Sequence, residues 1–269
     1  MSETESPLTT RPAAHPAMKN AGKNLITVAS GKGGVGKTVL SVSLAHALSN
    51  AGKKVLLFDG DVGLANVDIQ LGLMPDFDLA TVVSGQQKLK DVAFRFEEGG
   101  FDIIAGRSGS GSLGTLDSNH LKAVHEELIT LGEEYDYIIL DLGAGIDAAV
   151  QTLASAKGPK IVVTNGEPTS LTDAYAFIKV TSQSQENADT RILVNMVKSK
   201  SDGKKVYEKL LAACKNFLHL EPPLAGIIPQ DDRISASIRA QTPLLSRYPN
   251  SPAAEEIEAL ANYLMRGSG

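Results

Sequence analysis

The stretch "VASGKGGVGKTVLS", residues 28–41, decides the fold of this 269-residue chain. An apolar run precedes it and a helical pattern follows. Glycine adopts backbone angles that other residues avoid, so a glycine-rich loop can bring its N–H groups close to an anion. "GKGGVGKT" also fits G-x-x-x-x-G-K-[ST], a loop that holds phosphates at the positive N-terminus of a helix. The residues expected to hold a nucleotide are Gly33, Gly34, Val35, Gly36, Lys37, Thr38 and Val39.

The two lysines of this loop need separate explanations. Lys37 supplies a point charge for the outer phosphates, and the hydroxyl of Thr38 suits a magnesium ion. Lys32 lies on the same tight loop, where a second positive charge is repulsive unless it meets negative charge. A phosphate contact within its own chain, or a solvated side chain, would be the simplest explanations for Lys32.

Short apolar runs alternate with helical patterns from residue 25 onward. The runs are residues 25–30, 54–59, 101–106, 135–141, 160–165, 191–197 and 224–229. Most are continuously apolar, which indicates strands covered on both faces. We predict a single α/β domain at residues 24–266, with a doubly wound, mostly parallel sheet and helices on both faces. Residues 1–23, rich in Ser, Thr, Pro and Ala, are expected to form a disordered arm.

Acidic residues follow two of these runs. "LLFDGDVGLANVD", residues 56–68, carries Asp59 and Asp61, and "YIILDLGAG", residues 137–145, carries Asp141. The carboxyl ends of parallel strands meet at one edge of a sheet, where ligands bind. Asp141, at the end of an apolar strand and before glycines, is typical of a Walker B carboxylate that orders magnesium. Capping of the next turn is the competing interpretation for all three aspartates.

"KGGVGKT", residues 32–38, resembles the deviant Walker A motif of the MinD/ParA ATPases. The resemblance implies ATP and Mg²⁺ as cofactors and a homodimer that forms on ATP binding. It implies that Lys32 reaches the phosphates of the partner's ATP and that Asp61 positions the attacking water. The expected catalytic residues are therefore Lys32, Lys37 and Asp61, and the expected metal residues are Thr38, Asp59 and Asp141.

The resemblance also places the adenine. Asn195, which follows an apolar run, and "IIPQDD", residues 227–232, match the positions where that family holds the base. An amide can present both a donor and an acceptor to a base edge, while Pro229 and Asp231 would line the pocket through their backbone. A structural asparagine and a plain loop are the alternatives.

Two longer stretches resemble the flagellar number regulators of the FlhG/FleN type. They are "DGDVGLANVDIQLGL", residues 59–73, and "EPTSLTDAYAFIK", residues 167–179. This implies a slow, dimer-activated ATPase switch that controls flagellar number or placement, acts with flagellar assembly or regulatory proteins, and works in the cytoplasm with recruitment to a cell pole. Within the second stretch, Ala174, Phe177 and Ile178 are expected in the core, and Glu167, Thr169 and Asp173 at the dimer or a partner.

A partitioning or cell-division ATPase of the MinD/ParA type is the alternative function, acting on DNA, the septum or other cargo. "KSKSDGKK", residues 198–205, is where DNA would be contacted, with a solvated loop as the competing interpretation. The formal net charge of −5 gives no strong nucleic-acid signal. The single cysteine, Cys214, cannot form a cysteine-ligated cluster within one chain and is expected to be buried. Residues 1–24 lack the DQAxxLR motif with which FlhG-type regulators stimulate a GTPase.

The C-terminal segment predicts a helix that packs on the protein. Ser251 and Pro252 form a helix start, and residues 257–264 carry apolar side chains at helical spacing. A membrane-binding helix would carry basic residues on its other face, whereas this one carries glutamates. We therefore expect no membrane contact through this helix.

Overall fold

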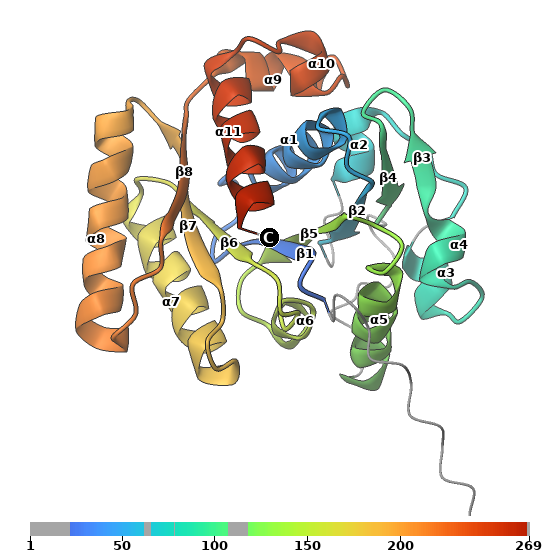
Figure 1. Cartoon of the computed structure of the whole chain (residues 1–269), viewed down its shortest axis with the longest axis horizontal. Helices are drawn as coiled ribbons and strands as arrows, with labels where there is room; N and C mark the ends of the chain where they lie inside the picture. Colours follow the sequence, from blue (N-terminus) through green and yellow to red (C-terminus); the bar gives the residue numbers. More distant parts are fainter. Residues whose placement is uncertain (1–21, 62–65, 78, 107–117, 268–269) are drawn as a thin grey trace, which may run out of the picture.

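The computed structural model describes residues 22–61, 66–77, 79–106 and 118–267 (Figure 1). Within them, one 8-stranded sheet has the order β3-β4-β2-β5-β1-β6-β7-β8. All neighbouring strands are parallel except β3 and β4. The strands are β1 (Leu25–Ser30), β2 (Val55–Gly60), β3 (Phe94–Phe96), β4 (Phe101–Ile104), β5 (Tyr137–Ala144), β6 (Lys160–Thr164), β7 (Thr190–Val197) and β8 (Leu224–Pro229). The predicted mostly parallel sheet is confirmed, whereas residues 1–21 of the predicted arm lie outside the described part of the chain.

Helices cover both faces of the sheet. They are α1 (Lys37–Asn50), α2 (Val67–Leu71), α3 (Leu79–Val83), α4 (Leu89–Val92), α5 (Ser118–Leu131), α6 (Ala148–Leu153), α7 (Pro168–Ser184), α8 (Lys200–Leu218), α9 (Asp232–Arg239), α10 (Leu244–Arg247) and α11 (Pro252–Arg266). Buried side chains of α1, α10 and α11 pack on one face, and those of α5, α6, α7 and α8 pack on the other (Figure 1). Because the central strands β1, β2, β5 and β6 are covered on both faces, their residues are buried along almost their whole length.

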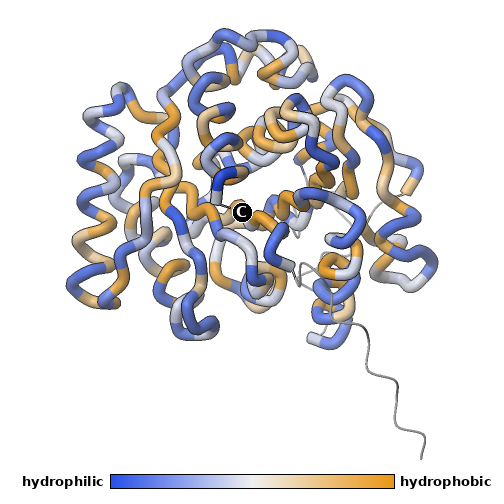
Figure 2. Tube along the Cα trace, in the orientation of Figure 1, coloured by the Kyte–Doolittle hydropathy of each residue, from blue (hydrophilic) through white to orange (hydrophobic). Residues whose placement is uncertain are grey.

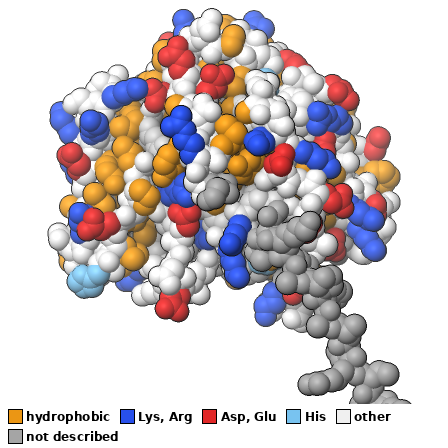
Figure 3. Space-filling view, in the orientation of Figure 1, with side chains coloured by type: hydrophobic (Ala, Val, Ile, Leu, Met, Phe, Trp, Pro, Cys, Tyr) orange, Lys and Arg blue, Asp and Glu red, His pale blue; other side chains and the backbone are white. Residues whose placement is uncertain are grey.

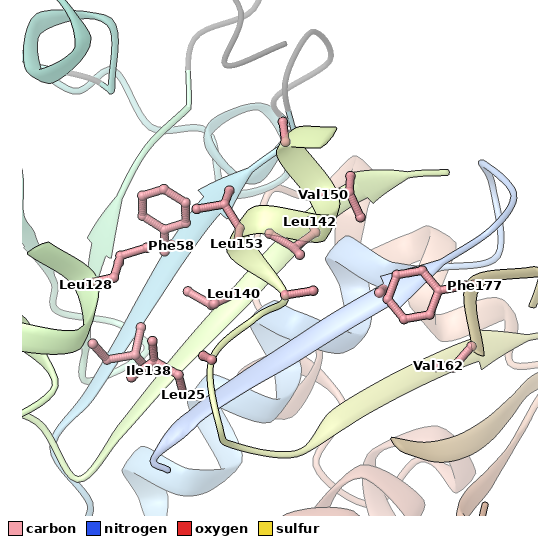
Figure 4. Close-up of a cluster of buried hydrophobic side chains, with 14 of the residues drawn as sticks. Leu25, Phe58, Leu128, Ile138, Leu140, Leu142, Val150, Leu153, Val162 and Phe177 are labelled. Atoms are coloured by element: carbon pink, nitrogen blue, oxygen red, sulfur yellow. The ribbon is translucent and has the colours of Figure 1, made fainter. Parts of the chain in front are cut away.

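The core behind the second face is built around β5. Ile138, Leu140 and Leu142 point to the same side of the sheet and meet Leu128 of α5 and Leu153 of α6 (Figure 4). All five side chains are completely buried. In Figure 2 the strands at the centre of the molecule are coloured mainly as hydrophobic. The helices and sheet thereby form a rigid frame for the loops at the strand ends.

The sequence prediction omitted β3. Its three residues alternate, with Phe96 buried and Arg95 exposed, and they pair antiparallel with β4. Phe96 and Phe101 contact each other edge to face, with ring centroids 5.4 Å apart. A strand this short lacks the continuous apolar run of the central strands, and it is held by its pairing with β4, the burial of Phe96 and the Arg95–Asp102 salt bridge.

The C-terminal helix α11 packs on the protein body as predicted. Ser251 Oγ accepts a hydrogen bond from Ala254 N, and Pro252 occupies the first turn. Ile257, Leu260, Ala261 and Leu264 are buried in the core beside α1. Cys214 is buried too, and burial raises the pKa of its thiol to about 11. Among the described residues, no helix combines the length and apolar character needed to cross a membrane.

Candidate nucleotide-binding site

The glycine loop joins β1 to α1 at the carboxyl edge of the sheet. Gly34 and Gly36 have φ angles of +79° and +89°, in the left-handed region that favours glycine. A Cβ atom at Gly33 or Gly34 would meet nothing within 4 Å, so their backbone is open to a ligand. A Cβ at Gly36 would lie 2.5 Å from Asn195 Nδ2. The side chain of Val35, between Gly34 and Gly36, is buried in the core and anchors the loop.

Lys37 is the first residue of α1 and is buried. Burial lowers the pKa of its amine, while the nearby charges of Asp141 and Asp61 act to raise it. A lysine this poorly solvated gains from any further negative charge that enters the loop. Its position agrees with the predicted role in holding phosphate.

Asp141 lies next to this lysine. Ser41 Oγ donates to Asp141 Oδ1 at 3.0 Å, and the Thr38 side chain also hydrogen-bonds this carboxyl. Burial raises the pKa of Asp141 to about 6, although these hydrogen bonds and Lys37 oppose the rise. Its Oδ2 is buried and has no hydrogen-bond partner among the described residues. The prediction that Asp141 ends its strand is wrong by three residues, because β5 continues to Ala144 beside Ser30.

Asp59 is the direct neighbour of Asp141 on the adjacent strand, β2. Its Oδ1 accepts from Asp61 N at 3.2 Å, and its Oδ2 accepts from Asn66 N at 3.2 Å and Val67 N at 3.1 Å. Burial, reinforced by the charge of Asp141, raises the pKa of Asp59 to about 7. Asp61 lies at the rim, half-buried, and residues 62–65 of the stretch that follows it lie outside the described ranges.

Lys32 contacts α7 of its own chain. Its Nζ donates to Glu167 Oε2, in a salt bridge, and to Thr169 Oγ1 at 3.1 Å. The hydrogen bond and the charge of Lys32 lower the pKa of Glu167. Close backbone packing joins the same two segments, because a Cβ at Gly31 would lie 2.3 Å from the carbonyl of Asp173.

The predicted base pocket lies beside this contact. A cavity of about 600 Å³ is lined by residues that include Glu167, Met196, Pro229 and Asp231. Asp231 caps α9, with Oδ1 accepting from Arg233 N at 3.0 Å, so it faces the cavity from a fixed backbone. This volume is in the usual range for small-molecule sites, roughly 300–1,000 Å³.

Asn195 lies at the same edge but is engaged within the chain. Its Nδ2 donates to Val35 O at 2.8 Å, and its Oδ1 accepts from Met196 N at 2.9 Å. An amide nitrogen has two donor hydrogens and an amide oxygen has two lone pairs. Asn195 therefore braces the glycine loop, with one donor hydrogen and one lone pair outside these two bonds, and its contact with a base stays a prediction.

Residues 26–244 match the CobQ/CobB/MinD/ParA nucleotide binding domain family. The chain belongs to this family. The resemblance to the MinD/ParA family is therefore confirmed, and so is the α/β fold predicted from the alternating apolar runs and helical patterns.

Two curated relatives of this MinD/ParA-type chain carry flagellar names. Antiactivator FleN of Pseudomonas aeruginosa is 35% identical over 237 residues, which is 88% of this chain and 84% of FleN. The flagellum site-determining protein YlxH of Helicobacter pylori is 33% identical over 243 residues, which is 89% of this chain and 81% of YlxH. The septum site-determining protein MinD of Pyrococcus horikoshii, solved with Mg-ADP, superposes with a TM-score of 0.75 at 25% identity and covers 91% of this chain and 97% of MinD.

The residues present fit a magnesium ion. Mg²⁺ is usually held by one or two carboxylates together with substrate phosphates. Asp141 Oδ2 is a buried oxygen without a partner in the described part of the chain, and the Thr38 side chain contacts the same carboxyl group. Among the described residues, no group of three or more Asp, Glu, His or Cys side chains has the arrangement needed to hold a metal ion. The site therefore suits a metal that a nucleotide brings with it.

Sequence reasoning missed one residue of this site, Ser41, and one contact between two predicted residues, Asn195 and Val35. Ser41 follows Lys37 by one helical turn and faces Asp141, and this spacing within the quoted stretch was the available signal. The contact of Asn195 with Val35 joins residues 160 positions apart, so no local pattern could indicate it.

Proposed function

We propose that this chain is an ATP-hydrolysing switch that dimerises when it binds ATP and controls flagellar number or placement. The observation that carries the proposal is the pair of lysines, Lys32 and Lys37, on one glycine loop in a chain whose curated relatives include FleN and YlxH. Lys37 is buried at the phosphate end of α1, whereas Lys32 is partly exposed at the rim. The proposal assigns Lys37 to the nucleotide of its own chain and Lys32 to the nucleotide of a neighbouring chain.

Each residue has a distinct role in this proposal. The N–H groups of residues 33–39 and Lys37 bind the phosphates, and Asn195, Pro229 and Asp231 line the base pocket. Magnesium, when bound with ATP, would neutralise phosphate charge from a position beside Thr38, Asp59 and Asp141. Asp61, at the rim of the site, would orient the attacking water. Phosphoryl transfer depends mainly on such positioning and charge neutralisation.

The contact between Lys32 and Glu167 supports an idle state for the single chain. Water and salt screen an exposed salt bridge, so this contact holds Lys32 only weakly. The phosphates of a nucleotide bound to a second chain would therefore compete successfully with Glu167 for Lys32. Hydrolysis would then rise in the dimer, because only a partner's Lys32 would complete the charge around the transferred phosphoryl group.

The test compares cells that carry the gene with cells that lack it. We expect deletion to change the number or position of flagella, counted by electron microscopy. Wild-type protein should restore the original count, and Lys37→Ala should not. A matched lysine variant at the opposite edge of the sheet, Lys53→Ala, should restore it fully.

The partitioning alternative gives a different result in the same cells. Unchanged flagella together with displaced septa or lost DNA would refute the proposal in favour of that alternative. Two lysines of residues 198–205 are already engaged within the chain, Lys200 with Glu256 and Lys205 with Asp202.

A further inference from the structure

An apolar groove separates α7 from α8 on the outer surface. Its volume is about 420 Å³, and Leu171, Tyr175, Leu210, Ala213 and Phe217 line it. Phe217 is 74% exposed, although it is one of the largest apolar side chains of the protein. Figure 3 shows hydrophobic side chains gathered over α8, at the left of the view. A concentration of exposed apolar side chains with a hollow beside it is typical of a protein-binding surface.

The rim of this groove is basic. Lys209 lines the groove itself, and Lys179 follows Tyr175 by one turn of α7 on the same face. Both lysines are exposed, and neither forms a salt bridge with any described residue. Lys205 lies one turn before Lys209, and Asp202 is 3.8 Å from its amine. On a chain with a net charge of −5, this rim is a local concentration of positive charge.

We propose that the groove between α7 and α8 binds an amphipathic, acidic helix of a partner protein. Both walls are helices whose backbone groups are bonded internally, so no strand edge is available to an extended peptide. A third helix can instead place apolar side chains at i, i+3, i+4 and i+7 into such a groove. Its glutamates or aspartates would face Lys179 and Lys209. Opposite charge at the rim favours this partner over a neutral or basic one.

The groove is connected physically to the nucleotide site. α7 begins at Pro168, directly after Glu167, the residue that holds Lys32. Gly31 packs on the backbone of Asp173 within the first turns of α7. A helix bound along α7 can therefore shift the balance between the Lys32–Glu167 contact and dimerisation. This docking site goes beyond the proposed function, because binding in the groove does not require hydrolysis.

The experiment uses the full chain and two labelled peptides of about 16 residues. Both carry leucine at i, i+3, i+4 and i+7, flanked by glutamate in one peptide and by lysine in the other. Fluorescence anisotropy should detect binding of the glutamate peptide and much weaker binding of the lysine peptide. Phe217→Ser should weaken glutamate-peptide binding about tenfold, as expected for losing a buried aromatic contact. Lys209→Glu should reverse the preference between the peptides.

Matched controls distinguish this site from other surfaces. Phe77→Ser removes another exposed phenylalanine, and Lys122→Glu reverses an exposed lysine on α5; both should bind like wild type. Equal binding of the two peptides, no binding of either, or wild-type affinity in Phe217→Ser would overturn the proposal. A nucleotide-free dimer that Phe217→Ser dissociates would overturn it too, by assigning the groove to a second copy. ATP hydrolysis, followed in parallel, reports separately on the proposed switch.

Discussion

Two carboxylates and a lysine, Asp59, Asp141 and Lys37, are buried together at the carboxyl edge of the sheet. Burial of charge is costly unless it is paired or hydrogen-bonded. The chain supplies backbone N–H groups to Asp59 and hydroxyls to Asp141, yet the pKa values of both carboxyls remain raised, to about 7 and about 6. Such unrelieved charge is typical of a functional site. At the scale of single residues, the site is built to receive a cation and an anion together.

Variants of Lys37 and Asp61 should affect two different steps, ATP binding and ATP turnover. Lys37→Ala removes the buried cation that faces the phosphates, so we expect loss of ATP binding. Asp61→Ala removes the group proposed to orient the attacking water, so binding should persist while turnover falls on the order of 100-fold. Fluorescent ATP analogues and phosphate release measure the two steps. Normal turnover in the Asp61 variant would exclude this residue from catalysis.

His46 should make stability depend on pH. It is buried on α1 beside Phe101, and its Nδ1 has no partner among the described residues. Burial lowers the pKa of His46 in the folded chain below its ordinary value of 6.5. The unfolded chain therefore binds the proton more tightly, so the stability contribution of neutral His46 is complete above pH 6.5 and declines as the pH falls below it.

The comparison of His46→Met with wild type tests this directly. Between pH 7.5 and 5.5 the melting temperature of wild type should fall further than that of His46→Met. His219→Asn replaces an exposed histidine with φ of +57°, a conformation that asparagine tolerates, and should behave like wild type. Identical pH profiles for all three proteins would show that His46 is not the group responsible.

At the scale of elements, α11 is a structural helix. Leu260 is 1% exposed and packs in the core beside α1 and β8. Leu260→Ala should lower the free energy of unfolding by about 2–5 kcal/mol, measured by urea denaturation. Asn262→Ala, two residues away on the exposed side, should change it by less than about 0.5 kcal/mol. Equal effects would mean that α11 does not pack as described.

The same helix should not bind membranes. Its exposed side carries Glu255 and Glu258, and Glu256 forms a salt bridge with Lys200 of α8. Anionic lipid would repel these carboxylates. We expect no ATP-dependent co-sedimentation with anionic liposomes at physiological salt. Sedimentation that requires ATP and is lost when residues 252–267 are deleted would contradict this prediction.

An element could be predicted from the sequence when the residues that cause it to form lie close together along the chain. The central strands, such as Leu25–Ser30, are continuous apolar runs because both faces are covered. Such a run can be recognised from the amino-acid sequence alone. The cap of α11 at Ser251 is equally local. β3 depends on its hairpin with β4, where Phe96 meets Phe101. The hydrogen bond from Asn195 to Val35 forms because the sheet brings β7 close to the glycine loop. Those features follow from topology, which no short stretch encodes.

At the scale of the whole molecule, the proposed function requires a second chain to complete the site. The carboxyl edge of the sheet brings together the glycine loop, both buried aspartates and the base pocket, but it directs Lys32 toward α7 at the rim. Lys32 is therefore the group best placed to meet a second molecule. On dimerisation, Lys32 would leave the carboxylate of Glu167 in its own chain and would contact the phosphates of the nucleotide bound to the partner chain.

ATP should drive this exchange in solution. We expect the Asp61→Ala variant to sediment as a monomer with ADP and as a dimer with ATP, because the variant retains ATP that wild type would hydrolyse. Adding Lys32→Ala to that variant should keep it monomeric with either nucleotide, since the cation that crosses to the partner is gone. Lys53→Ala, at the opposite edge of the sheet, is the matched control and should dimerise normally. If the Asp61 variant is monomeric with both nucleotides, or dimeric with both, ATP does not control assembly and Lys32 has no role across an interface.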